Sequence, residues 1–365
     1  MNVCDVAPPH IRSIAAYQPG KPISELAREL GLDPASIVKL ASNENPLGIS
    51  PRARRAIESA LSDLARYPDG NGFELKESLS ARYRIAPDRI VLGNGSNDVL
   101  DLAARAFLTP QDEAVYSQYA FAVYPLAVQA IGATAVEVPA TDYGHDLDAM
   151  RRSVTPKTRL VFVANPNNPT GTFVEGSVLE TFIASLPPSA LVVLDEAYNE
   201  YLPPEAAFDS LAWLERYPNL VVTRTFSKVY GLAGLRVGYA FASREVADLM
   251  NRVREPFNVN SMALVAAAAA LQDLEFVSRS HELNRVGMKQ LTAGLISLHL
   301  KFIPSFGNFV TFEVADAPAV FQRLLRAGVI VRPLAGYGMP NHLRVSIGLE
   351  SENARFLDVL RQAIA

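Results

Sequence analysis

The stretch LVVLDEAY, residues 191–198, is an apolar run that ends directly in charged and polar residues. Two further runs have the same form: LVFVA at 160–164 leads into NPNNPTG, and LVVT at 220–223 leads into RTFSK. Short apolar runs bounded by turn residues are typical of strands buried in a parallel sheet. The three polar ends would then lie together at one edge of that sheet, where α/β folds bind their ligands.

Helical patterns alternate with strands over most of the chain. Ser50 followed by Pro51 favours the start of a helix, since serine caps helices and proline fits the first turn. Residues 90–92 and 237–242 predict two more strands, and residues 98–108 predict a helix. This alternation predicts an α/β fold, with a mostly parallel sheet and helices on both faces.

The alternation of strands and helices ends at about residue 261, where a long helical region begins that runs to residue 299. We expect a large domain over residues 41–260 and a smaller α+β domain over residues 261–365. The N-terminal segment, residues 1–40, would pack on the small domain or on a partner subunit. The small domain is expected to contain strands at 308–314, 329–331 and 343–347, and helices at 317–327 and 352–365.

The composition argues against several classes of partner. Hydrophobic residues make up 49% and the net charge is −4, which gives no broad attraction to nucleic acid or anionic lipid. The longest apolar run, residues 262–271, is too short for a membrane span, which needs about 20 residues. The five histidines and the single cysteine, Cys4, have no metal-ligand spacing, so we expect no metal and a cytoplasmic location.

Each polar strand end has an ordinary explanation when it is taken alone, as a turn, a helix cap or a surface Ser-Lys pair. In this order, and with GLRVG at 234–238, the three ends resemble fold-type-I aminotransferases, which depend on pyridoxal phosphate. The resemblance covers the chain from about Leu40 to its C-terminus. It implies an enzyme with pyridoxal 5′-phosphate as its cofactor.

The resemblance assigns the central chemistry to Lys228 and Asp195. Lys228 would hold the cofactor aldehyde and also act as a base, which requires that its ammonium form be disfavoured, with help from the nearby Arg236. Asp195 would keep the cofactor ring nitrogen protonated, although a helix-capping aspartate is the ordinary alternative. Tyr198 and Asn168 would bind the hydroxyl oxygen of the ring.

The cofactor phosphate needs a site for a dianion. Residues Gly95, Ser96 and Asn97 stand at a predicted helix start, and free amides at helix N-termini bind anions. Thr225, Ser227 and Arg236 would complete this site. A dinucleotide-binding turn is the rival interpretation of Gly93-Asn94-Gly95, but the third glycine of that pattern falls on Asp98.

An aromatic side chain is expected to stack on the cofactor ring. The family pattern places this residue three positions before a tyrosine, here Tyr124, and so favours Phe121. Tyr119 would serve instead under a shifted register. Both aromatics could also belong to the core.

Within the superfamily the chain is most similar to histidinol-phosphate aminotransferases. The supporting segments are ASNENP at 41–46, RYP at 66–68, VIVRP at 329–333 and LRVSIG at 343–348. The implied reaction converts histidinol phosphate and 2-oxoglutarate into imidazole-acetol phosphate and glutamate, in histidine biosynthesis. The alternatives are an aminotransferase for phenylalanine or tyrosine and, third, a phosphothreonine decarboxylase.

The same resemblance implies the substrate contacts. Arg344 and Arg332 would bind phosphate and carboxylate, because a guanidinium pairs bidentately with either group. Tyr17 and Asn45 would lie beside them, and a surface position after an edge strand is the alternative for Arg332. Tyr67 would reach the cofactor of a neighbouring chain, which implies a homodimer with shared active sites.

Overall fold

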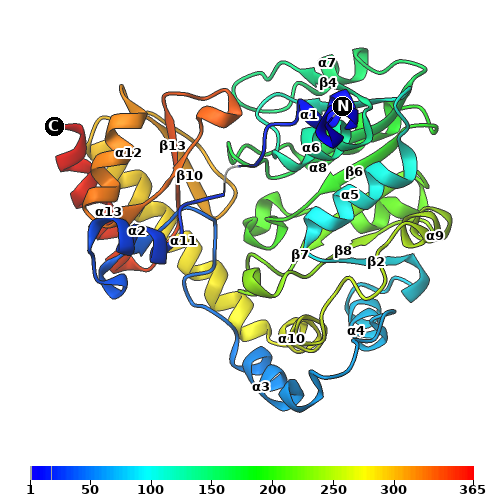
Figure 1. Ribbon diagram of the computed structural model, residues 1–365, viewed down its shortest axis with the longest axis horizontal. Coiled ribbons are helices and arrows are strands. Elements are labelled where there is room, and N and C mark those ends of the chain that lie inside the picture. Colours follow the sequence, from blue (N-terminus) through cyan, green and yellow to red (C-terminus); the bar gives the residue numbers. More distant parts are fainter. Residues whose placement is uncertain (1, 18) are drawn as a thin grey trace.

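The computed structural model describes residues 2–17 and 19–365, which form two bodies of sheet and helix (Figure 1). The larger body contains a seven-stranded sheet, and the smaller body contains a four-stranded sheet and the C-terminus. Helix α11, Leu274–Ser297, runs from the larger body into the smaller one. The N-terminus lies at the larger body and α2, Ile23–Leu30, at the smaller, so the N-terminal segment crosses between them.

The seven-stranded sheet has the strand order β2-β8-β7-β6-β5-β3-β4. The five strands from β7 to β4 in this order are parallel, and β8 runs antiparallel to both of its neighbours. The predicted α/β fold with a mostly parallel sheet is therefore confirmed. The strands are β2 Ile90–Gly93, β3 Glu113–Ser117, β4 Thr134–Val138, β5 Thr158–Ala164, β6 Leu191–Asp195, β7 Leu220–Thr225 and β8 Gly238–Phe241.

The central strands β5 and β6 are largely apolar because both faces of this sheet are covered. In β5, Val161 and Val163 belong to the core cluster on one face, and Leu160 and Phe162 belong to the cluster on the other. Alternate residues of a strand point to opposite faces, so a strand between two helix layers needs apolar residues at every position. Each such side chain contributes roughly 1.5–3 kcal/mol when it is buried.

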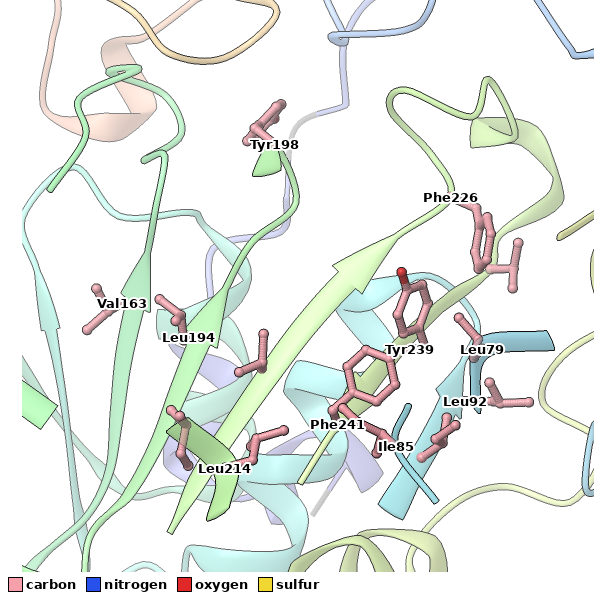
Figure 2. Close-up of a cluster of buried hydrophobic side chains, with 14 of the residues drawn as sticks. Leu79, Ile85, Leu92, Val163, Leu194, Tyr198, Leu214, Phe226, Tyr239 and Phe241 are labelled. Atoms are coloured by element: carbon pink, nitrogen blue, oxygen red, sulfur yellow. The ribbon is translucent and has the colours of Figure 1, made fainter. Parts of the chain in front are cut away.

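Figure 2 shows part of the first of these two clusters. The rings of Tyr239 and Phe241 contact each other edge to face, with centroids 5.3 Å apart, and lie close to Leu79 of α4 (Phe73–Tyr83). Tyr198 lies apart from them, beyond the carboxyl end of β6. The apolar cluster therefore fixes the strands below the edge at which the polar residues gather.

The sequence pattern does not predict β3 and β4. Strand β4 lies at the edge of the sheet, where Val138 is buried while Thr134 and Glu137 are exposed, so its apolar run is interrupted. Strand β3 has Glu113 and Ser117 at its ends, which leaves only three apolar residues between them. Such short mixed runs resemble loops when they are judged from sequence alone.

Helices cover both faces of the large sheet. Helix α3 begins as predicted at Pro51, because Ser50 caps it: the Ser50 hydroxyl oxygen accepts a hydrogen bond from the Ala53 amide at 3.0 Å. The helices of this body are α1 Pro9–Arg12, α3 Pro51–Ala60, α4 Phe73–Tyr83, α5 Ser96–Phe107, α6 Val123–Ile131, α7 Leu147–Arg152, α8 Gly176–Ser185, α9 Arg244–Arg252 and α10 Ser261–Leu271.

The smaller body has an antiparallel sheet of order β12-β13-β10-β9, packed on α11, α12 and α13. The predicted strand at 329–331 is divided in the structure. Its first part pairs with β1, in parallel, and the segment that follows pairs with β13. The elements are β1 Val38–Lys39, β9 Phe302–Ile303, β10 Phe309–Glu313, α12 Ala317–Arg326, β11 Val329–Ile330, β12 Arg332–Pro333, β13 His342–Ser346 and α13 Glu350–Ile364.

The N-terminal segment packs on both bodies. Leu26 and Ala27 of α2 are buried against Leu325 and Ile330 of the smaller body. Helix α1 contacts α6 of the larger body. Helix α2 thus packs on the smaller body, where the N-terminal segment is expected, whereas α1 packs on the larger body. The domain boundaries themselves stay a prediction.

The long helical region predicted from residue 261 is two helices, α10 and α11. Asp273 ends the continuity because its carboxylate caps the new helix, accepting from the Phe276 amide at 3.3 Å. The two helices meet at 82°. Among the described residues no single helix is long and apolar enough to cross a membrane, and only this bent pair meets the length and composition test.

In the turn after Lys228 the backbone approaches another segment so closely that an added side chain should destabilise the fold. Gly231 has φ +70°, and a Cβ there would lie 1.9 Å from the carbonyl oxygen of Gly48. Gly231→Ala should therefore destabilise the protein by about 2 kcal/mol or more, since strained backbone and a backbone clash add. The measurement is the denaturant midpoint of the purified chain.

Gly234→Ala is the matched control for this change. Gly234 lies three residues further along, in the 3-10 helix Ala233–Leu235, and a Cβ added there would meet nothing within 4 Å. Its free energy of unfolding should stay within about 0.5 kcal/mol of the unchanged protein. Equal effects of the two substitutions would contradict the proposed close approach of the two backbones.

Candidate active site

A cavity of about 250 Å³ lies at the carboxyl ends of β5, β6 and β7 and reaches the smaller body. The structure brings most of the predicted site residues together here, from segments far apart in sequence. Within the described chain, no group of three or more His, Cys, Asp or Glu side chains could hold a metal ion. The predicted residues that line the cavity are Tyr17, Ser96, Asn97, Phe121, Asn168, Asp195, Tyr198, Thr225, Ser227, Lys228, Arg236, Arg332 and Arg344.

Lys228 follows β7 and points its amine into this cavity. Nζ donates a hydrogen bond to the Ser42 carbonyl oxygen at 3.2 Å and lies 5.6 Å from the centre of the Tyr198 ring. Burial lowers the pKa of Lys228 to about 7, with the positive charge of Arg344 as the next cause, although Glu44 opposes the shift. A large share of this amine is therefore unprotonated near neutral pH.

Asp195 is the last residue of β6 and is 5% exposed. One of its oxygens, Oδ2, accepts a hydrogen bond from the Tyr124 hydroxyl at 2.8 Å, and Oδ1 accepts from the Thr223 hydroxyl at 3.1 Å. Burial raises the pKa of Asp195, and the bonds from Tyr124 and Thr223 oppose that rise. The carboxylate is thus a buried acid held by two neutral donors.

The start of α5 and the Arg236 guanidinium form a cup suited to an anion. Gly95, which precedes the helix, has φ +82° and provides no side-chain cap for the first amides of α5. A Cβ at Gly95 would lie 2.3 Å from a guanidinium nitrogen of Arg236. Arg236 also donates to the Ser227 hydroxyl at 3.3 Å, so amides, a hydroxyl and a positive charge converge here.

Tyr198 and Asn168 line the cavity beside Arg344. The Tyr198 oxygen accepts a hydrogen bond from the Asn43 side-chain amide at 2.9 Å, and burial raises the pKa of Tyr198 to about 12. The Tyr198 hydroxyl is therefore protonated at neutral pH and remains able to donate. The Asn168 side-chain oxygen accepts from Arg344.

Two arginines enter the cavity from the smaller body. Arg344 on β13 and Arg332 on β12 are direct partners across the two strands. Arg344 donates to the Ala41 carbonyl oxygen at 3.0 Å and is buried, and burial lowers its pKa. The Arg332 guanidinium lies 5.4 Å from the ring centre of Tyr17. Two adjacent strands therefore present two positive charges to one cavity.

The structure distinguishes between the two aromatic candidates. Phe121 lines the cavity, and its ring contacts Tyr124 edge to face at 5.9 Å. Tyr119 has φ +57° and packs against Tyr143, with ring centroids 5.9 Å apart, outside the cavity. A shifted register would need Tyr119 in the cavity, so the geometry supports Phe121 as the stacking residue.

Three predicted residues do not line the cavity. Gly95 lies behind it, where its lack of a side chain makes room for Arg236. Tyr67 is 83% exposed and stacks on Phe257 at 4.9 Å, at the surface of the chain. Asn45 corrects the expectation of a substrate contact, because its amide donates to the Val229 carbonyl and to the Ser280 hydroxyl, both at 2.8 Å.

Sequence reasoning missed several residues of the site. Asn43, which has φ +54°, lines the cavity and bonds Tyr198, whereas Asn45 of the same segment does not line the cavity. The predicted segment thus reaches the site through a different asparagine. Tyr337, which lines the cavity, and Tyr124 come from segments without a polar strand end to mark them.

The fold and the cavity lysine of lowered pKa define the class of protein, and known sequences agree. The sequence pattern of the family described as aminotransferase class I and II matches residues 35–360. The chain belongs to this family and is an aminotransferase.

Within this family, several histidinol-phosphate aminotransferases are similar in sequence to this chain over nearly its full length. The chain is 62% identical over 360 residues to the histidinol-phosphate aminotransferase of Methylobacillus flagellatus, covering 99% of this chain and 98% of that protein. It is 59% identical over 365 residues to histidinol-phosphate aminotransferase 2 of Nitrosospira multiformis, covering 100% and 93%. The predicted resemblance to this group is confirmed.

A solved structure of a histidinol-phosphate aminotransferase is also similar to this chain. The histidinol-phosphate aminotransferase of Sinorhizobium meliloti, in complex with pyridoxal-5′-phosphate, matches with a TM-score of 0.90. The two chains are 28% identical, and the match covers 98% of this chain and 97% of that one. The fold therefore persists where much of the sequence differs.

The pKa of Lys228 generates a prediction for the cofactor-free protein. Because the pKa is lowered to about 7, labelling of this amine by formaldehyde and cyanoborohydride should rise with pH and level off above about pH 8. The neutral fraction increases about tenfold between pH 6 and pH 8, whereas that of an ordinary lysine keeps rising to about pH 10. Peptide mass spectrometry measures the labelling of Lys228 at each pH.

Arg344→Gln tests whether the neighbouring positive charge helps to lower the pKa of Lys228. This change removes a positive charge that lowers the pKa of Lys228, so the plateau should move to higher pH. Labelling of Lys228 that still increases between about pH 8 and pH 10 in the unchanged protein would refute a lowered pKa.

Proposed function

We propose that this aminotransferase transfers the amino group of histidinol phosphate to 2-oxoglutarate, producing imidazole-acetol phosphate and glutamate in histidine biosynthesis. The observation that carries the proposal is the identity of 62% with a histidinol-phosphate aminotransferase over 99% of the chain. The cavity supports it, because two arginines from the smaller body offer sites for the phosphate and carboxylate groups of these substrates.

Pyridoxal 5′-phosphate is the proposed cofactor, and the residues present fit it. Lys228 offers a partly buried amine of lowered pKa, Asp195 a buried carboxylate, and the cup at α5 an anion site that a side chain at position 95 would fill. When bound, the cofactor supplies an aldehyde that takes up the amino group and a ring that withdraws electrons. Ser96, Asn97, Thr225, Ser227 and Arg236 are proposed to hold its phosphate.

Lys228 is the proposed proton carrier of the reaction. Its Nζ would accept the proton that leaves the α-carbon of the substrate. A base must be unprotonated to do so, and a pKa of about 7 allows this at neutral pH. The Ser42 carbonyl oxygen, 3.2 Å from Nζ, orients the amine.

Asp195, Tyr198 and Asn168 are proposed to orient the cofactor ring. The Asp195 carboxylate would hold the proton on the ring nitrogen, because a buried anion favours a cation beside it. Tyr198, whose hydroxyl keeps its proton, and Asn168 would bind the hydroxyl oxygen of the ring. Phe121 would pack on the ring face.

Arg344 and Arg332 are proposed to bind the substrate anions in alternate half-reactions. Arg344 is the more deeply buried and would hold the carboxylate of glutamate. Arg332, beside Tyr17, would bind the phosphate of histidinol phosphate. A guanidinium suits both groups, so one pocket can accept substrates of unlike shape.

A homodimer with shared sites is also proposed. Exposed apolar side chains gather near Tyr67, and its stacking partner Phe257 is itself 47% exposed. Such exposed apolar residues mark interaction surfaces. The exposed large hydrophobic residues in this region are Leu61, Leu64, Tyr67, Phe73 and Phe257. We place the enzyme in the cytoplasm, where an exposed free thiol such as Cys4 stays reduced.

The substrate assignment is tested by Arg332→Ala. A charge-assisted bond to phosphate is worth about 1.5–3 kcal/mol, so kcat/KM for histidinol phosphate should fall roughly 10- to 150-fold. The rate with phenylalanine, which has no phosphate, should change much less. Steady-state rates with histidinol phosphate, phenylalanine and phosphothreonine measure this.

Two further variants serve as controls for Arg332→Ala. Arg332→Lys keeps the charge but loses the planar fork, so it should lie between the parent and Arg332→Ala. Arg326→Ala, at an exposed arginine of α12, should leave all three rates unchanged. An unchanged protein that prefers phenylalanine would overturn the proposed substrate.

Subunit mixing tests the shared sites. Lys228→Ala and Tyr67→Phe are each expected to be inactive or nearly so, and mixed dimers would regain one complete site. After subunit exchange in equal amounts, activity should reach roughly a quarter of the unchanged enzyme.

Lys228→Ala mixed with Asp195→Asn is the matched control. Both residues belong to the cavity of the same chain, so no complete site forms in this mixture. A mixture with Tyr67→Phe that remains as inactive as this control, with exchange verified, would disprove the role of Tyr67 in the neighbouring site.

A further inference from the structure

We propose that Tyr124 is a positioning residue for Asp195, which it orients and keeps ionised toward the cofactor ring nitrogen. The inference rests on the proposed function, because it concerns the group that Asp195 would face. Tyr124 does not line the cavity and would act only through the carboxylate.

The contact between the two side chains is direct and buried. Tyr124 lies in the first turn of α6 and is 1% exposed, and its hydroxyl donates to Oδ2 of Asp195 at 2.8 Å. Thr223 donates to the other oxygen, Oδ1, at 3.1 Å. The Ala197 backbone amide also bonds this carboxylate. Donors on both oxygens fix the rotation of the carboxylate, and Tyr124 is a donor to Oδ2.

Contacts with two aromatic rings hold the Tyr124 ring in place, independently of its hydroxyl. The ring stacks on Phe162 of β5, with centroids 4.6 Å apart and planes 4° from parallel. It also contacts Phe121 edge to face, at 89° and 5.9 Å. One side chain therefore contacts both the aromatic that lines the cavity and the acid. A Tyr124→Phe change would keep these ring contacts and remove only the hydroxyl.

The hydroxyl also has an electrostatic effect on the acid. Burial raises the pKa of Asp195, and the bond from Tyr124 is the largest opposing cause, followed by Thr223. The other titratable groups around the carboxylate are Glu196, which raises its pKa, and Lys228 and Tyr198, whose own pKa values the Asp195 charge raises. Without the Tyr124 hydroxyl, Asp195 should take up a proton at higher pH.

The donor itself stays protonated under these conditions. Burial, with the nearby Asp195 charge, raises the pKa of Tyr124 well above its usual value. The phenol therefore donates across the whole working range of pH. Its partner oxygen remains an acceptor as long as the carboxylate is ionised, so the pair favours the anion.

The test compares Tyr124→Phe with Tyr116→Phe. Tyr116 is a buried tyrosine of β3 in the same core cluster, and it makes no hydrogen bond to Asp195. Binding of pyridoxal phosphate to the cofactor-free protein, followed by fluorescence, should weaken about tenfold in Tyr124→Phe and stay unchanged in Tyr116→Phe. The pH below which binding fails should rise by about one unit in Tyr124→Phe only.

A double-mutant cycle separates positioning from general stability. If Tyr124 acts through the carboxylate, adding Tyr124→Phe to Asp195→Asn should change the dissociation constant less than about twofold. A loss on Tyr124→Phe that is as large in the Asp195→Asn protein as in the unchanged protein would mean that Tyr124 is only structural, and would overturn the inference. Binding by Tyr124→Phe equal to that of Tyr116→Phe would also overturn it.

The unchanged protein distinguishes this inference from the proposed function. Borohydride reduction of the loaded enzyme should place a pyridoxyl adduct on Lys228. Failure of the unchanged protein to bind the cofactor, or an adduct elsewhere, would reject the proposed function itself. Normal loading of the unchanged protein with no effect of Tyr124→Phe would reject only the role of Tyr124.

Discussion

The amine of Lys228 is partly buried beside the positive charge of Arg344, and the rest of the site depends on keeping that arrangement stable. Buried cations need acceptors, and the chain provides them from its backbone. The carbonyl oxygens of Ala41 and Ser42 accept from Arg344 and Lys228, at 3.0 Å and 3.2 Å. The segment between the two bodies is therefore part of the site as well as a connection.

The same segment connects the two sheets through side chains. The Ser346 hydroxyl on β13 donates to the side-chain oxygen of Asn43 at 3.0 Å, and the Asn43 side-chain amide donates to Tyr198 at 2.9 Å. Tyr198 stands just beyond β6 of the large sheet. Polar contacts at the site thus help to set how the smaller body sits on the larger one, and a loss at Asn43 would affect both geometry and chemistry.

Much of the fold and the site could be predicted from sequence, because the central strands end in polar residues that the sheet brings together. Lys228 and Asp195 are found in this way. Strand β4 could not be, since Thr134 and Glu137 interrupt its short apolar run, which then resembles a loop. Asn43 and Asn45 lie two positions apart and have different partners, which the sequence does not reveal, and the bond from Tyr124 to Asp195 joins residues 71 positions apart.

Arg332 and Arg344 face each other across β12 and β13, whereas Asp195 ends β6 and Lys228 follows β7 of the other sheet. The two pairs therefore belong to separate pieces of backbone with separate cores. Under the proposed roles, descendants of an ancestral enzyme could acquire new amino donors through changes confined to one pair of strands. A change at Arg332 would leave the groups that set the pKa of Lys228 in place, whereas a change at Arg344 would also raise that pKa, so substrate range and proton transfer are linked through one of the two arginines.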